Sequence, residues 1–191
     1  LEEFRRAFTS GGGAIVAEAA YASQPDTDFA QVVRRLLRNA PDGLLYIAGA
    51  IDVARLAQQS RRQAPRLPIA ASEWAASEQL TELGGSLVEG LLILQNYNRY
   101  DESPRYVAFR DAFAQRFQRL PGYSAVAAYD AATVLFTALS RRQRGDSVKA
   151  AVLKYGPYQG LQQQISFDAF GDTTRQAFFT EIQQGRFVLV R

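Results

Sequence analysis

The sequence predicts an α/β protein with a doubly wound, mostly parallel sheet, followed by the helical part of a second, incomplete lobe. Three observations predict this architecture. Short apolar runs alternate with amphipathic segments up to residue 97, helical periodicity then fills residues 105–155, and strand patterns return after residue 160. Strands that alternate with helices at short spacing are typical of a parallel sheet covered by helices.

The first part of the chain supplies the elements of this sheet. Helical periodicity and capping residues predict three helices, over residues 2–10, from a cap at Asp26 or Thr27 to residue 39, and over residues 52–63. Runs of apolar and β-branched residues predict three strands, over residues 14–21, 44–48 and 67–71. The strand 44–48 is almost wholly apolar, which favours a strand whose two faces are both covered.

Residues 67–97 are the most informative segment. They predict a buried strand, an acidic loop, a helix, a Gly-Gly break and a second apolar strand. The loop holds Glu73 beside Trp74, which is the only tryptophan. Ligands of open parallel sheets bind beyond the carboxyl ends of the strands. A carboxylate next to an indole suits a small ligand that carries a positive charge and apolar bulk.

The later part of the chain is helical before it returns to strands. Helices are predicted over residues 105–119, 124–141 and 146–155, and strands over 162–167, 176–183 and 187–190, the last two as a hairpin. Because no strand interrupts the three helices, their apolar faces around Phe109, Phe113 and Val134 are expected to be exposed. Such faces favour pairing with a second copy of the chain as a homodimer.

Composition excludes several kinds of chemistry. The chain has no Cys and no His, which removes thiol nucleophiles, His-based triads, disulfides and the usual zinc sites. Gly11–Gly13 precede a predicted strand and do not open a helix, so they form no phosphate-binding loop. Asp168 and Asp172 flank a turn, and too few oxygen ligands follow them for a calcium site. No two carboxylates form a convincing catalytic pair. The sequence therefore predicts neither an enzyme nor a cofactor or metal site.

The net charge is +3, and only Lys149 and Lys154 among the 22 basic residues are lysines. Arginines gather at residues 34–38, 61–62 and 141–144, near the ends of predicted helices. Cations favour the carboxyl end of a helix dipole, so solvated helix ends are favoured over nucleic-acid binding.

No stretch is apolar enough to span a membrane, and no signal-peptide pattern is visible. The chain opens inside a helix without a cap, so its beginning is expected to be missing.

Five passages of the sequence are similar to the carboxyl-terminal half of type I periplasmic binding proteins, specifically the leucine/isoleucine/valine-binding family of ABC transporters. They are FRRAFTSGGGAIVAEAAY, DGLLYIAG with DVARLAQQSR, LPIAASEWAASEQLTELGGSLVEGLLI, SPRYVAFRDAFAQRFQRLPGYSAVAAYDAATVL, and ISFDAFGD with the hairpin after it. The resemblance implies two lobes that close on a ligand. Residues 1–96 and 173–191 would form the second lobe, residues 97–172 the hinges and the later helices of the first lobe, and the early first lobe would be absent.

The resemblance also implies a ligand site. Glu73 matches the acid that binds a ligand ammonium group, while Gly49 and Ala50 stand where relatives often place an aromatic contact and so suggest a roomier cleft. Tyr123 or Ser124 would face the ligand from the first lobe. Glu73 can instead stabilise the helix after it, and Trp74 and Tyr123 can instead pack on neighbouring helices.

The function implied is that of a substrate-binding component of an ABC importer. It would bind an amino acid, branched-chain or aromatic, in the interlobe cleft and deliver it to a membrane permease. The location implied is the periplasm, or the cell exterior with a lipid anchor. The same fold also serves as the ligand-sensing domain of receptors and transcriptional regulators, which stays open as the alternative.

Overall fold

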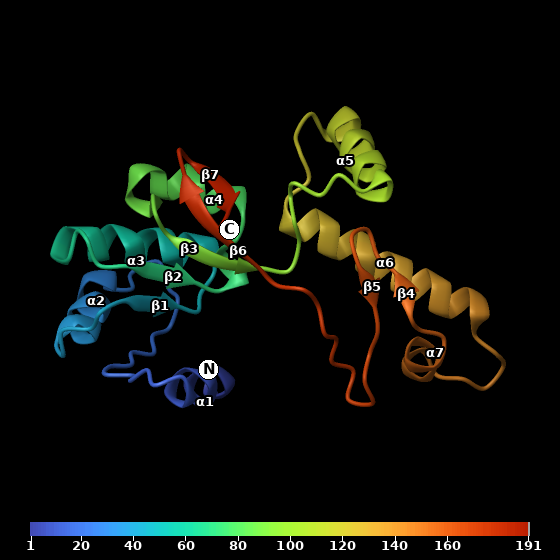
Figure 1. The fold of residues 1–191 in the computed structure, drawn as a ribbon, viewed down its shortest axis with the longest axis horizontal. Helices are drawn as coiled ribbons and strands as arrows, with labels where there is room; N and C mark the ends of the chain where they lie inside the picture. Colours follow the sequence, from blue (N-terminus) through green and yellow to red (C-terminus); the bar gives the residue numbers. More distant parts are fainter. Residues whose placement is uncertain (191) are drawn as a thin grey trace. The chain divides into compact units, whose positions relative to one another are not determined.

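The computed structural model describes residues 1–190, which form two compact units (Figure 1). The first unit contains Leu1–Ala75, Gln79–Ile93 and Glu181–Val188. The second contains Ala76–Glu78, Leu94–Thr180 and the last residues of the chain. Each unit is described by itself.

A five-stranded sheet in the order β1-β2-β3-β6-β7 organises the first unit. The strands are β1 (Leu44–Tyr46), β2 (Ile69–Ala71), β3 (Leu92–Gln95), β6 (Phe178–Gln183) and β7 (Arg186–Leu189). β1 pairs with β2, and β2 with β3, in parallel. In this register Tyr46 stands opposite Ala71 and Ala71 opposite Ile93, so the carboxyl ends of the three strands share one edge. The doubly wound, mostly parallel sheet predicted from the sequence is therefore confirmed.

Helices connect these strands. They are α1 (Glu2–Ser10), α2 (Phe29–Leu37), α3 (Ala50–Gln63), the short 3-10 turn η1 (Glu73–Ala75), α4 (Glu78–Gly84) and the 3-10 turn η2 (Gly85–Val88). The predicted cap of α2 was wrong by one or two positions: Asp28 accepts a hydrogen bond from the Gln31 backbone N–H at 2.9 Å. An acceptor there satisfies one of the N–H groups that the first turn of a helix leaves unpaired.

Helix α3 packs on one face of the sheet and contacts α2, and the other face is open at β1. Tyr46 turns its hydroxyl toward α3, where it lies 2.6 Å from the Ser60 hydroxyl. Burial raises the pKa of the Tyr46 phenol, which keeps that hydroxyl protonated. On the opposite face, Leu45 is 36% exposed and Ile47 is 43% exposed. The prediction that this strand is covered on both faces was therefore wrong.

The strand predicted over residues 14–21 is not part of the sheet. The segment is extended and its side chains alternate between partly buried and exposed, yet it belongs to no ladder. A strand forms only where a neighbour accepts and donates its backbone hydrogen bonds, and no neighbour is in place here. The prediction of a strand over residues 14–21 was therefore wrong.

The hairpin of β6 and β7 was predicted correctly, including its two-residue turn (Figure 1). Gln184 and Gly185 have φ values of 52° and 69°, as the commonest two-residue hairpin turn requires. Glu89 holds this turn from a distant part of the chain. Its carboxylate accepts the backbone N–H groups of Gln184 at 2.8 Å and of Gly185 at 2.7 Å.

The second unit is mainly helical. It contains α5 (Pro104–Phe117), α6 (Tyr123–Arg141), α7 (Val148–Lys154) and a two-stranded antiparallel sheet of β4 (Tyr158–Gln159) and β5 (Gln164–Ile165). β4 was not predicted, because two residues carry no readable period. No helix in residues 1–190 is long and apolar enough to cross a membrane.

Two small cores hold the second unit together. One joins α6, α7, β4 and β5 through Val134, Ala138, Ala151, Tyr158 and Ile165. The other joins α5 and α6 through Tyr97, Tyr106, Val126 and Leu161, with Phe109 and Tyr123 packed against it. Val134 is therefore buried, and the prediction that it is exposed was wrong. The exposed large apolar side chains of α5, α6 and α7 include Phe117, Tyr129, Leu135, Phe136, Leu139 and Val148.

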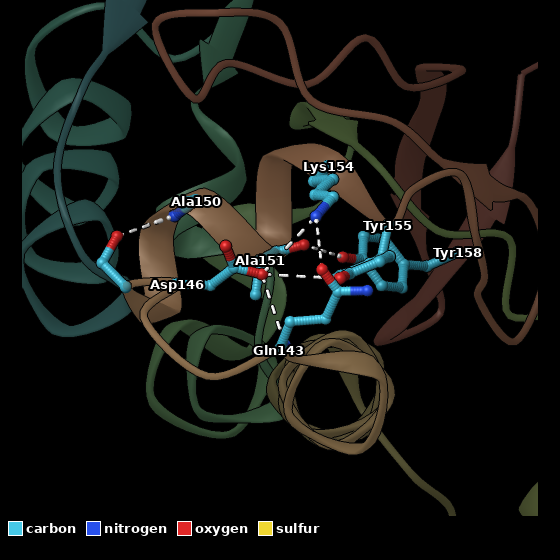
Figure 2. A network of polar contacts seen from close by, with 8 residues as sticks. Gln143, Asp146, Ala150, Ala151, Lys154, Tyr155 and Tyr158 are labelled. Carbon is cyan, nitrogen blue, oxygen red and sulfur yellow. Dashed lines mark hydrogen bonds and ion pairs between the residues drawn. The ribbon is translucent and has the colours of Figure 1, made fainter.

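Figure 2 shows the connection between α6 and α7, where polar side chains organise the turn. The Asp146 carboxylate accepts the Gln143 backbone N–H at 3.3 Å and the Tyr155 hydroxyl at 3.4 Å, and Lys154 Nζ lies 3.6 Å from it. Ser147, not Asp146, caps α7 by accepting the Ala150 N–H at 3.1 Å. The predicted start of this helix was therefore two residues early.

Candidate functional site

The carboxyl edge of β1 and β2 holds four of the six residues predicted to bind a ligand. The Ser72 backbone N–H donates to the Tyr46 carbonyl at 2.9 Å, so the two strands end side by side. Gly49 and Ala50 follow β1, while Glu73 and Trp74 follow β2. Helix α3 and the turn η1, which begin at these residues, contact each other. The structure thus brings the two predicted groups to one edge of the sheet.

The turn after β1 is open and sterically undemanding. Gly49 has ordinary extended backbone angles, and a Cβ added there would meet no atom within 4 Å. Its carbonyl accepts the Val53 N–H at 3.0 Å and so starts α3. No side chain caps this helix start. Space for a larger group therefore remains beside Gly49, and the roomier cleft implied by the resemblance stays a prediction.

Close to this helix start, Tyr21 and Asp52 form a polar pair that the sequence analysis missed. The Tyr21 hydroxyl donates to Asp52 Oδ2 at 3.1 Å. Burial, reinforced by the negative charge of Asp52, raises the pKa of the Tyr21 phenol. Tyr21 therefore remains a hydrogen-bond donor at neutral pH. The only sequence signal for this contact was an acidic residue, Asp52, in the first turn of a predicted helix.

The turn after β2 presents an acid, an indole and a hydroxyl. Glu73 is half-buried at the first position of η1, and Trp74 next to it is 68% exposed. The Ala75 N–H donates to the Ser72 carbonyl at 3.0 Å and tightens the turn. The Ser72 hydroxyl is buried and has no hydrogen-bond partner among the described residues. Ser72 was not predicted as a site residue, although a polar residue directly before Glu73 was a usable signal.

Tyr123 and Ser124, the other two predicted contacts, lie at the start of α6 in the second unit. The Tyr123 ring packs 6.4 Å from the ring of Tyr97, between centroids, at the edge of a small core. Ser124 is exposed. Tyr123 thus has the packing role considered for it, and a ligand role for either residue stays a prediction.

Other places in the described chain offer less to a ligand. Residues 1–190 contain no group of three His, Cys, Asp or Glu side chains able to hold a metal ion. A shallow hollow of about 570 Å³ lies at the amino ends of β1 and β2, and its walls are Pro41, Asp42, Ala64, Pro65, Arg66, Leu67 and Pro68. Ligands of parallel sheets bind at the opposite, carboxyl ends.

The carboxyl edge therefore combines a carboxylate, a large exposed apolar surface and an open turn. A carboxylate at this place can accept charge-assisted hydrogen bonds from an ammonium group. The indole face can cover an aliphatic chain, a ring or a cation. The edge thus offers both a charged and an apolar contact surface.

Comparison with known proteins agrees with this fold. The sequence profile of the periplasmic binding protein family matches residues 1–186. No curated protein matches the chain.

Several solved structures share the fold. The chain is 23% identical to the leucine binding protein LivK of Thermotoga maritima, with a TM-score of 0.88, and matches over 100% of its own length and 55% of that protein. It is 21% identical to LivJ of Streptococcus pneumoniae, solved with isoleucine, with a TM-score of 0.83. That match covers 99% of this chain and 55% of LivJ. It is 18% identical to a solute binding protein of R. palustris, solved with benzoate, with a TM-score of 0.81. That match covers 100% of this chain and 53% of that protein. The chain thus spans about half the length of these proteins.

Proposed function

We propose a solute-binding role for this chain, because it belongs to the periplasmic binding protein family and has the type I fold of that family. The chain would be part of the substrate-binding component of an ABC importer. Its task would be to hold a small molecule at the carboxyl edge of the sheet without changing it, and to deliver it to a membrane permease. The periplasm, or the outer surface of the cell, is the corresponding location.

A single observation carries this proposal: Glu73 and the exposed Trp74 stand beside Gly49 at the carboxyl ends of two adjacent parallel strands. The edge is where open parallel sheets bind small ligands. The acid provides charge recognition, the indole provides apolar contact, and the glycine leaves room for the ligand.

The chemistry of this edge favours an amino acid over a simple carboxylate. An ammonium group near Glu73 would gain a charge-assisted hydrogen bond, whereas benzoate would bring a second negative charge close to the first. Trp74 and the open turn at Gly49 favour a branched or aromatic side chain. The Ser72 hydroxyl, which lacks a partner, would add a hydrogen bond to the polar end of the ligand.

The test is a titration of the chain with L-leucine, L-isoleucine, L-phenylalanine and benzoate. Trp74 is the only tryptophan and is exposed, so its fluorescence reports on ligand binding directly, and calorimetry supplies the affinity. At least one amino acid should bind more tightly than benzoate. Glu73→Gln should weaken this binding by about 1.5–3 kcal/mol, as expected for a hydrogen bond to a charged group.

Glu82→Gln is the matched control, because it removes the same charge from an exposed position on α4 in the same unit. It should leave the affinity unchanged. Equal affinity of the wild-type chain and Glu73→Gln would remove Glu73 from the site. Preferential binding of benzoate would contradict the proposed class of ligand.

A further inference from the structure

The carboxyl edge of the sheet carries a second acid besides Glu73. Asp52 lies in the first turn of α3, which begins directly after Gly49. The side chains of a helix lean toward its amino end, so the partly buried Asp52 carboxylate leans toward the edge where β1 ends. Within the described chain, the one hydrogen bond of this carboxylate is with Tyr21.

Tyr21 fixes one oxygen of Asp52 and leaves the other open. The Tyr21 hydroxyl donates to Asp52 Oδ2 at 3.1 Å, and Oδ1 accepts no hydrogen bond from any described residue. Tyr21 is itself held by the ring of Phe29 on α2, edge to face, at 5.4 Å between centroids. Because an ionised carboxylate offers about four acceptor positions, Asp52 is oriented by Tyr21 and keeps unused acceptor capacity.

Exposed apolar side chains accompany both acids. Ile51, directly before Asp52, is 44% exposed, and Trp74, directly after Glu73, is 68% exposed. Helix α3 and the turn η1, which carry these residues, contact each other. The turn at Gly49 leaves space beside the start of α3. The edge therefore presents two carboxylates together with a large apolar surface, all from the first unit.

We propose that Asp52, oriented by Tyr21, binds the far end of the solute whose ammonium group Glu73 binds. The solute is then an amino acid with an apolar side chain that ends in a hydrogen-bond donor, such as the phenol of L-tyrosine. This inference rests on the proposed function and deepens it, because it narrows the class of amino acid. Asp52 would be a binding residue and Tyr21 a positioning residue.

The chemistry of Asp52 explains this selectivity. Its contact with Tyr21 is already a hydrogen bond from a phenol to a carboxylate, so a second phenol suits the open oxygen. Trp74 and Ile51 would cover the ring of such a ligand. A wholly aliphatic ligand would instead cover the Asp52 carboxylate without giving it a donor, and burying a charge in that way is unfavourable.

A purely structural role for Asp52 predicts a different result. An acid in the first turn stabilises a helix through the helix dipole. Removal of an acid with that role alone would lower the stability of the fold and weaken all ligands alike. Recognition predicts that the loss concerns only the ligand that carries the donor. The ratio of two affinities therefore separates the two roles.

The experiment is a calorimetric titration of the chain with L-tyrosine and L-phenylalanine, which differ by one hydroxyl group. The wild type should bind tyrosine at least about tenfold more tightly, as expected for a hydrogen bond to a charged group. Asp52→Ala should bind both amino acids with the same affinity. Tyr21→Phe should reduce the preference without abolishing it, because Asp52 keeps its charge and loses its orientation.

Asp42→Ala is the matched control. Asp42 is an exposed acid of the same unit that precedes β1, at the opposite end of the sheet from Asp52. The variant removes the same charge and should keep the full preference for tyrosine. Thermal unfolding shows whether each variant folds. If Asp52→Ala does not fold, Asp52→Asn decides, because its neutral side chain should lower the preference while keeping the shape of Asp52.

The outcomes separate this inference from the proposed function. Equal binding of tyrosine and phenylalanine by the wild type would overturn the inference and leave the proposed function in place. A preference that survives both Asp52→Ala and Asp52→Asn, or that Asp42→Ala removes equally, would do the same. If the wild type binds none of the amino acids tested, the proposed function fails and this inference fails with it.

Discussion

The two compact units connect distant parts of the chain by different means. In the first unit, backbone ladders join β1, β2 and β3, and the strands and helices α2 and α3 bury apolar side chains. In the second unit, side chains hold the backbone. Buried Asp130 accepts the Leu161 N–H at 2.8 Å, and the Gln162 side chain bonds to both the N–H and the carbonyl of Asn98.

The difference follows from the amount of sheet in each unit. The strands of the second unit are two residues long, so a ladder can satisfy few of its backbone groups. Buried backbone groups that lack a partner cost free energy. Polar side chains therefore take over this task, as Asp168 also does by accepting the N–H groups of Phe170, Gly171 and Asp172. The second unit should thus depend on a few polar residues, and the first on its whole core.

Asp130→Ala should have the largest effect and confine it to the second unit. The change leaves the buried Leu161 N–H without its acceptor and Arg175, whose Nη1 lies 3.6 Å from Asp130, without its partner. We expect a loss of about 3–5 kcal/mol, as for other broken buried charged contacts. Hydrogen exchange should accelerate at Ala151 and Ile165 and stay unchanged at Ile93 in the first unit.

Asp130→Asn is the control for this prediction. Its side-chain oxygen can still accept the Leu161 N–H, so the loss should be smaller than for alanine. Equal losses would show that the charge near Arg175, and not the hydrogen bond to the backbone, is the main contribution. Faster exchange at Ile93 would contradict the independence of the two units.

Gln162→Ala should have an intermediate effect. The change removes the two hydrogen bonds between Gln162 and Asn98. These bonds join segments that are 64 residues apart in the sequence. We expect a loss of about 1–3 kcal/mol in urea unfolding, at roughly 0.5–1.5 kcal/mol for each bond. Gln63→Ala is the matched change in the first unit, where the side chain makes only a long contact of 3.4 Å to the Ala30 carbonyl. A loss at Gln63 as large as that at Gln162 would contradict the comparison.

Alkaline pH should weaken both units by a smaller amount. Burial raises the pKa of Tyr46 in the first unit and of Tyr97 in the second above the ordinary value of 10.0. Below pH 10 both phenols are protonated in the folded and in the unfolded chain, and their contribution to the free energy of unfolding is fully present. Above it the unfolded chain loses its protons first, so stability falls as pH rises through the higher folded pKa.

The check is urea unfolding at pH 8 and pH 10.5, followed by exchange in each unit. Tyr46→Phe should reduce the loss in the first unit and leave that in the second unchanged. An identical pH response of the wild type and the Tyr46→Phe variant would mean that other groups control the alkaline transition.

Local patterns in the sequence determined the helices, the hairpin and the position of Glu73 and Trp74. Helical periodicity located α1, α3, α5 and α6 to within a few residues, and two turn residues specified the hairpin. These features depend on residues close together in the chain. The sequence also placed Glu73 and Trp74 just after an apolar run, and the parallel register then set them beside the turn at Gly49.

Only the tertiary structure decided which extended segments become strands and which polar side chains are buried. Residues 14–21 have a strand pattern but no partner, because pairing depends on a neighbour that may be distant in sequence. Asp130 and Gln162 look like ordinary polar residues until the loop backbone reaches them from 31 and 64 positions away. Contacts of that kind leave no period in the sequence, so their energy becomes visible only when the chain is folded.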